Sequence, residues 1–142
     1  MRKTKLKTFC LTILLFCSFC SPSVGQKRIF KGTFKEKNEK IEIRLDLYKA
    51  SLYVPGMTFI GKVHGYMTGD IYGIWMLTSF KTKGKKATLR FSNDLGSDSQ
   101  SIKLTAVNDS IFEYEAIDGN HIRKVHNRKL VKIPTKLCFT RQ

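Results

Sequence analysis

The stretch that decides the fold is residues 59–80, which read Phe-Ile-Gly-Lys-Val-His-Gly-Tyr-Met-Thr-Gly-Asp-Ile-Tyr-Gly-Ile-Trp-Met-Leu-Thr-Ser-Phe. It contains the only tryptophan, Trp75, and Thr68-Gly69-Asp70 near its middle has the composition of a turn. We therefore predict a hairpin of two strands about this turn. The second strand has apolar residues in both alternating registers, which predicts that both of its faces are covered.

The residues before this hairpin show the clearest two-residue alternation in the chain. Residues 40–48 read Lys-Ile-Glu-Ile-Arg-Leu-Asp-Leu-Tyr, which puts the aliphatic side chains on one face and the charged ones on the other. Shorter segments with a similar pattern occur at 87–91, 101–107 and 111–117. No segment has the helical spacing that a crossover between parallel strands needs.

Turn signals separate these segments along the whole chain, near residues 38, 56, 69, 84, 96, 108 and 118. They predict an all-β fold, an antiparallel meander of eight or nine strands joined by tight turns. Such a sheet hides its edges by closing into a small barrel, which we favour because nearly every connection is local. The alternative is a β-sandwich. Pro134, near the middle of the last segment, 129–139, suits an edge or a bulge.

The N-terminus has the features of a secretory signal peptide. A basic start is followed by an apolar run at 11–19, which is too short to span a bilayer, and by the small residues Ser23 and Gly25. We predict cleavage after Gly25, which leaves residues 26–142 as a single all-β domain in the periplasm or outside the cell.

The cysteines suggest an alternative processing of the same segment. Cys17 or Cys20 could become the acylated first residue of a lipoprotein, which would anchor the chain to the envelope. Each of them follows a phenylalanine, where the lipoprotein peptidase needs a small residue. Cleavage after Gly25 removes Cys10, Cys17 and Cys20 and leaves Cys138 alone, without an internal disulfide.

In size, strand order and expected export, the chain from residue 26 is similar to the small calycin barrels of the lipocalin type. Their Gly-X-Trp signature stands on the first strand, whereas Gly73-Ile-Trp75 stands on about the fourth here. The resemblance therefore implies a calycin-like architecture and no particular family. Residues 61–75 also resemble one MORN repeat, a hairpin unit that works in tandem arrays, but no second copy follows.

The chain is strongly basic, with 26 Lys and Arg against 11 Asp and Glu. Four of the basic residues and none of the acidic ones lie in 1–25, so residues 26–142 carry a net charge of +11. A surface of this charge attracts anionic polymers and lipid head groups. Export would separate the chain from cytoplasmic nucleic acid, which argues against a nucleic-acid partner.

The sequence contains no recognisable metal site or catalytic constellation. The three histidines lack the acidic partners and spacing of ligands, and there is no Gly-X-Ser-X-Gly motif. Glu113 and Glu115 share a strand face roughly 7 Å apart, and we expect them to face solvent or a basic neighbour. Cys138 stands in an apolar segment and is expected to be a buried, inert thiol. We therefore predict neither an enzyme nor a cofactor.

Two kinds of binding follow from this reading. The leading hypothesis is an exported barrel that binds a small apolar or amphiphilic ligand in a cavity lined by Phe59, His64, Tyr66, Tyr72 and Trp75. The same barrel could bind an anionic envelope surface through a cationic rim, if two basic regions meet there: Lys83, Lys85 and Lys86 with Arg123 and Lys124. The alternative is an envelope structural or protein-interaction module whose barrel is filled by its own side chains. A hydrolase, the third hypothesis, would need converging carboxylates or a Ser/His pair.

Overall fold

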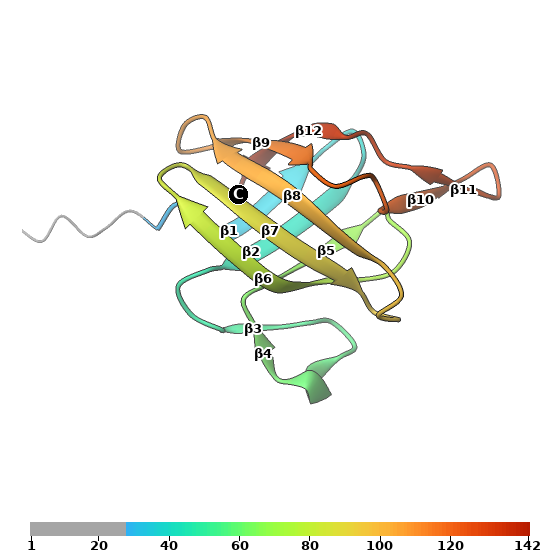
Figure 1. The fold of residues 1–142 in the computed structure, drawn as a ribbon, viewed down its shortest axis with the longest axis horizontal. Helices are drawn as coiled ribbons and strands as arrows, with labels where there is room; N and C mark the ends of the chain where they lie inside the picture. Colours follow the sequence, from blue (N-terminus) through green and yellow to red (C-terminus); the bar gives the residue numbers. More distant parts are fainter. Residues whose placement is uncertain (1–27) are drawn as a thin grey trace, which may run out of the picture.

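A computed structural model describes residues 28–142 and shows eight strands that close into an antiparallel barrel (Figure 1). The barrel strands are β1 (Lys31–Glu36), β2 (Ile41–Asp46), β5 (Gly65–Gly69), β6 (Trp75–Lys83), β7 (Lys86–Asn93), β8 (Ser99–Ala106), β9 (Ile111–Ala116) and β12 (Lys136–Arg141). Their order around the barrel is β1-β12-β9-β8-β7-β6-β5-β2. The predicted small all-β barrel is confirmed, whereas the predicted signal peptide and its Cys17 and Cys20 lie outside the described residues.

Two connections leave the barrel and project from it (Figure 1). Between β2 and β5, residues 47–64 form β3 (Leu52–Tyr53), the short 3-10 turn η1 (Thr58–Ile60) and β4 (Lys62–Val63). Between β9 and β12, residues 117–135 contain the hairpin of β10 (Arg123–His126) and β11 (Lys129–Lys132). The last apolar segment, 129–139, is thus divided between β11 and β12. Pro134 lies at the division, because proline has no N–H to donate to a neighbouring strand.

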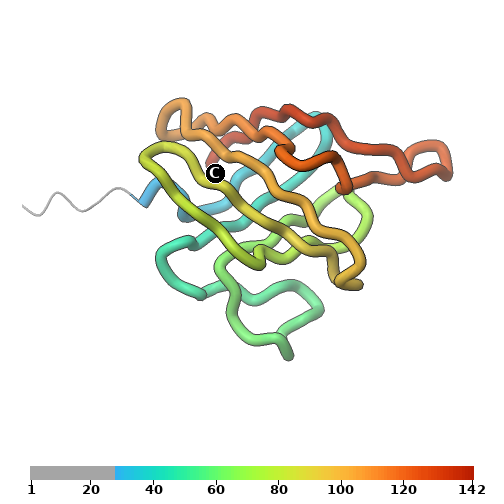
Figure 2. Tube along the Cα trace, in the orientation of Figure 1, coloured from blue at the N-terminus to red at the C-terminus, as the bar shows by residue number. Residues whose placement is uncertain are grey.

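The strand connections give the barrel two ends. At the end that we call the terminal end, the chain enters β1 and leaves β12, and the β6–β7 and β8–β9 turns lie there as well. The opposite end, the hairpin end, carries the β1–β2 turn, the β5–β6 and β7–β8 loops and the β10–β11 hairpin. Figure 2 shows the β6–β7 turn and the β10–β11 hairpin on opposite sides of the molecule.

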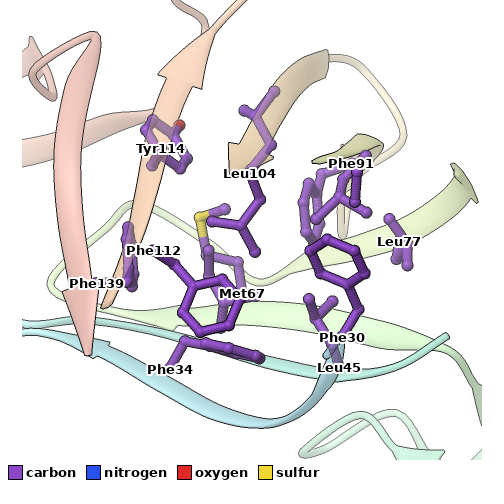
Figure 3. Packing of buried hydrophobic residues seen from close by; sticks show 14 of the residues in the cluster. Phe30, Phe34, Leu45, Met67, Leu77, Phe91, Leu104, Phe112, Tyr114 and Phe139 are labelled. Carbon is purple, nitrogen blue, oxygen red and sulfur yellow. The ribbon is translucent and has the colours of Figure 1, made fainter. Parts of the chain in front are cut away.

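Side chains of the protein fill the middle of the barrel. The ring of Phe112 meets the ring of Phe34 edge-on, with 4.6 Å between centroids, and lies 6.3 Å from that of Phe30. Figure 3 shows how large apolar side chains from different strands converge on the same space. Several of them have no exposed surface, including Phe34, Phe91, Phe112 and Phe139. An eight-stranded barrel is just wide enough for such a filling, so the centre is a packed core.

Within the decisive stretch, residues 65–80 form the predicted hairpin as β5 and β6, whereas 59–64 belong to η1 and to β4, which pairs with β3. In contrast to the prediction, β6 is not covered on both faces. Thr78 and Ser79 are exposed, and the register with β7 shifts between Leu77 and Ser79, which marks a β-bulge. Leu77 pairs with buried Phe91 before the bulge, and Phe80 pairs with buried Leu89 after it. Leu77 and Phe80 therefore both face the barrel interior, and the bulge between them explains why they stand in opposite registers of the sequence.

Asp46 ends β2 and holds the start of the 47–64 segment in place. Its carboxylate, 2% exposed, accepts hydrogen bonds from the backbone N–H groups of Tyr48 (3.2 Å) and Lys49 (3.1 Å) and from the Ser51 hydroxyl (2.7 Å). The Lys31 ammonium lies 3.5 Å away. Burial alone would raise the pKa of Asp46, but these donors together outweigh it, and the pKa lies below its ordinary value.

The substitution Asp46→Asn is expected to lower the free energy of unfolding by about 2 kcal/mol at neutral pH, the usual contribution of hydrogen bonds to a buried charged group. Because the folded state has the lower pKa, ionised Asp46 stabilises the fold fully above the unfolded-state pKa. That contribution is lost as the pH falls through the folded-state pKa. Urea unfolding at a series of pH values measures it, and a difference between variant and parent that is independent of pH would contradict this account.

Candidate functional site

A cavity of about 270 Å³ opens at the terminal end of the barrel. We call it the end cavity. Segments far apart in the sequence supply its lining, namely the segment that leads into β1, the β6–β7 turn, the end of β8, the β8–β9 turn, β9 and β12. The apolar wall consists of Ile29, Ala106 and Phe112, and the polar lining residues are Lys85, Asn108, Asp109 and Arg141.

Arg141 places a positive charge against the apolar wall of this cavity. Its guanidinium carbon lies 5.1 Å from the ring centroid of Phe112 and 5.4 Å from that of Phe34, in the range of cation–π contacts. One terminal nitrogen donates to the carbonyl of Ile29. The Nε atom is buried, and no residue within 28–142 accepts a hydrogen bond from it. An arginine has five N–H donors, so much of the donor capacity of Arg141 is left for another acceptor.

The remaining polar residues of the end cavity lie on two turns. Lys85 is exposed on the β6–β7 turn, where its carbonyl accepts the N–H of Ala106 at 2.8 Å. Asn108 closes the β8–β9 turn, because its side-chain oxygen accepts the N–H groups of Ser110 and Ile111, both at 2.8 Å. Asp109 lines the cavity from the same turn. The cavity thus has two cationic side chains and one carboxylate, a combination that favours an anionic ligand.

The five residues predicted to line a cavity do not come together, and none of them lines the end cavity. Trp75 and Tyr72 lie at the hairpin end, where they line a smaller cavity of about 100 Å³ with Arg123 and Leu130. The Trp75 indole is 2% exposed, and its Nε1 donates to the carbonyl of Tyr72 at 3.2 Å. This smaller cavity has less room than pockets for ordinary small-molecule ligands.

The other three predicted cavity residues lie elsewhere. Phe59 is in η1 on the 47–64 segment and is 81% exposed. His64 is half-buried, with Nδ1 2.9 Å from the carbonyl oxygen of Asp46 and its ring edge-on to Phe80. Tyr66 is buried but pairs with exposed Arg44 on the outer side of the barrel and does not belong to the core. Sequence alternation could not place Phe59 and His64, because the chain leaves the sheet before β5.

The cationic rim predicted from the sequence is divided between the two ends. Lys83, Lys85 and Lys86 lie on the β6–β7 turn at the terminal end, whereas Arg123 and Lys124 begin β10 at the hairpin end (Figure 1). Lys124 is also occupied, because its ammonium binds the carboxylate of Glu39. Of the five residues, Lys85 lines the end cavity.

Sequence reasoning overlooked Arg141, although one signal pointed to it. Leu137, Phe139 and Arg141 share one register of β12, and Phe139 is fully buried. An arginine at the end of an inward-facing register has to place its charge at the mouth of the barrel.

The same alternation corrects the expectation for Cys138. The thiol is exposed, because β12 turns it outward, opposite exposed Glu113. Glu115 has a basic neighbour as expected, with its carboxylate 3.4 Å from the Lys103 ammonium. Across residues 28–142, no three His, Cys, Asp or Glu side chains are grouped closely enough to hold a metal ion.

Comparisons of the chain with protein-family models, with curated proteins and with solved structures found no match. In the part of the chain from residue 28 onward, no helix has the length and apolar character needed to cross a bilayer. The end cavity, with its shape and its charges, is therefore the feature of the molecule that points to a function.

Proposed function

We propose that this protein is an exported, non-enzymatic binding protein whose end cavity holds a small amphiphile with an acidic group. The acidic group pairs with Arg141 and Lys85, and the apolar part of the ligand contacts Ile29, Ala106 and Phe112. One observation carries the proposal: the guanidinium of Arg141 lines an apolar cavity, and its hydrogen bond to the Ile29 carbonyl uses one of its five N–H donors. An acidic group in the cavity would accept charge-assisted hydrogen bonds from the terminal nitrogens of this guanidinium.

The size of the end cavity restricts the ligand. Pockets for drug-sized molecules are roughly 300–1,000 Å³, and this cavity lies just below that range. The packed centre of the barrel, below Phe112 and Phe34, leaves no continuation of the cavity inward. The proposal is therefore a short ligand held at the barrel mouth, in contrast to the long chain that a hollow barrel could enclose.

Replacement of Arg141 tests this function directly. A short-chain fluorescent carboxylic acid is titrated into the protein, and Arg141→Gln is expected to raise its Kd roughly tenfold or more, because charge-assisted hydrogen bonds contribute about 1.5–3 kcal/mol. The alcohol analogue of the probe carries no charge and should bind more weakly. Its Kd should be the same for the parent protein and for Arg141→Gln. This pair of probes separates a lost ion pair from a general distortion of the cavity.

A matched control uses an arginine on the outer wall. Arg44 is about half exposed and pairs with Glu42, away from the cavity. Arg44→Gln removes the same charge from the protein and should leave the Kd of the acid within twofold. Equal losses in both variants, or no saturable binding across a panel of short acids and alcohols, would refute the proposal.

The packed barrel interior favours a second candidate, the structural or protein-interaction module. In that case the end cavity is an incidental gap between the terminal turns. The acid titration separates the two functions, because a module without a ligand shows no saturable binding that depends on Arg141.

A further inference from the structure

The projection formed by residues 47–64 exposes large apolar side chains at its outer part. Phe59 is 81% exposed, Tyr53 53% and Ile60 40%. Single exposed apolar residues are normal on a protein surface, but a phenylalanine with most of its surface in water next to an exposed isoleucine is not. Such a group marks a surface that contacts something apolar.

The local structure of the projection keeps Phe59 in this exposed position. Leu52 pairs with Val63 and Tyr53 with Lys62 between β3 and β4. Beyond these pairs, backbone hydrogen bonds from Met57 to the carbonyl of Val54 (3.0 Å) and from Ile60 to that of Met57 (3.1 Å) close successive turns. Val54 is fully buried and fixes the base of these turns. The exposed tip is therefore a structured turn, in which the chain turns Val54 inward and Phe59 outward.

The charged side chains of the projection are all of one sign, with Lys49 at its base beside Asp46 and Lys62 behind the tip. Residues 47–64 contain Lys49 and Lys62 and no Asp or Glu, and both lysines are exposed. The Lys62 ammonium lies 5.7 Å from the centroid of the Tyr53 ring, so an aromatic side chain and a cation lie together just behind the apolar tip. Apolar residues at the tip, tyrosine behind them and lysine beside it match the order of chemical groups across a membrane surface, from acyl chains to head groups.

We propose that the β3–β4 projection docks the protein on a bilayer that contains anionic phospholipids. Phe59 and Ile60 insert beneath the head groups, and Lys49 and Lys62 lie beside the lipid phosphates. A protein partner fits the surface less well. An aromatic side chain buries roughly 150–250 Å², whereas a stable interface buries about 800 Å² on each partner. The small tip therefore falls short of a dimer interface, while a bilayer needs only a few inserted side chains.

The docking is independent of the proposed ligand, but the two features share one end of the barrel. The projection leaves the barrel after Asp46 and returns at Gly65, and both of these strand ends belong to the terminal end, where the end cavity opens. A docked protein would thus have its cavity on the same end as its membrane contact.

Vesicle sedimentation tests the proposal. The parent protein should bind vesicles of phosphatidylcholine mixed with phosphatidylglycerol, and Phe59→Ser should reduce the partition coefficient roughly tenfold or more, the effect of withholding one large apolar side chain from the bilayer. Lys62→Gln should reduce it about fivefold on the mixed vesicles and leave it unchanged on pure phosphatidylcholine. All variants carry the same residues 1–27, so that segment contributes equally to each measurement.

A matched control replaces an equally exposed apolar residue far from the projection. Leu95 lies in the β7–β8 loop at the hairpin end and is 76% exposed. Leu95→Ser should leave the partition coefficient within twofold of the parent. A loss equal to that of Phe59→Ser would show that general surface hydrophobicity, and not the projection, drives binding.

Tryptophan fluorescence gives a position-specific readout. In the variant Phe59→Trp, vesicles with brominated acyl chains should quench the new tryptophan, whereas in Leu95→Trp the emission should not change. Trp75 is 2% exposed, and the parent protein with and without these vesicles gives its own contribution. Absence of quenching at position 59, or a self-associated state in solution that Phe59→Ser abolishes, would overturn the proposal. Arg141→Gln should bind vesicles as the parent does, which keeps this test separate from that of the end cavity.

Discussion

Replacing Gly69 with alanine is expected to lower the free energy of unfolding by about 3 kcal/mol or more, because strained backbone and a steric clash add together. Gly69 ends β5 with φ +120°, a conformation that residues with a side chain rarely adopt. An added Cβ would lie 2.2 Å from the carbonyl oxygen of Lys40 and 3.0 Å from the Cα of Ile41. Both atoms belong to the backbone of the neighbouring β2 side, which cannot yield as a flexible side chain would.

A second glycine serves as the control for this prediction. Gly84 in the β6–β7 turn also has a positive φ, +58°, but no atom lies within 4 Å of the position of its Cβ. Gly84→Ala should therefore cost only the conformational penalty, about 1 kcal/mol. Urea unfolding of the two variants measures the difference. Equal costs would mean that the close approach of β5 to residue 40 is not required for the fold.

Replacing Phe112 with alanine is expected to lower the free energy of unfolding by about 3–5 kcal/mol, the range for deleting a buried aromatic ring. The ring has no exposed surface and is in contact range of Phe34, Phe30 and the guanidinium of Arg141. Its removal opens a hole in a packed core and also takes away the apolar wall of the end cavity. Binding of the short-chain acid should weaken as well, even under conditions where the variant is still folded.

The neighbouring residue provides the comparison. Ile111 stands next to Phe112 on β9, but its side chain faces outward and is 37% exposed. Ile111→Ala should change the free energy of unfolding by no more than about 1 kcal/mol and leave ligand binding unaffected. Thermal or urea unfolding of both variants measures the difference between their free energies of unfolding. A small effect of Phe112→Ala would show that the barrel interior is loosely filled, which would reopen the hypothesis of a central ligand cavity.

The fold was largely predictable because the residue pattern within each strand indicates which of its faces is buried. In β7 and β8, buried and less buried residues alternate along the strand, and the same two-residue period is visible in the sequence. Where the period breaks, prediction failed. The bulge after Leu77 made β6 look covered on both faces, and 129–139 was predicted as one segment although 129–132 pair with β10 in a separate two-stranded sheet. Neither feature has a signature in the alternation itself.

The candidate site was less predictable than the fold. Aromatic residues near the tryptophan were assigned to a cavity, but Phe59 and Tyr72 are exposed at different places, and Trp75 lies at the end of the barrel opposite the end cavity. The sequence does contain a signal for Arg141, because this residue stands in the same register as Phe139. The signal was missed because a charged residue at a strand end is usually assigned to the solvent.

The amino-acid sequence by itself determined the barrel strands, the turns between them and the excess of positive charge, since each depends on residue type and on spacing over a few positions. Closure of the sheet into a barrel, which the sequence favoured over a sandwich, was decided by the tertiary structure. The end cavity was decided only by the tertiary structure. Residues 29, 85, 106, 112 and 141 meet because closure of the sheet pairs β1 with β12 and brings two turns over the same opening. That meeting depends on the register around the whole barrel, and register is a property of pairs of strands that no single segment encodes.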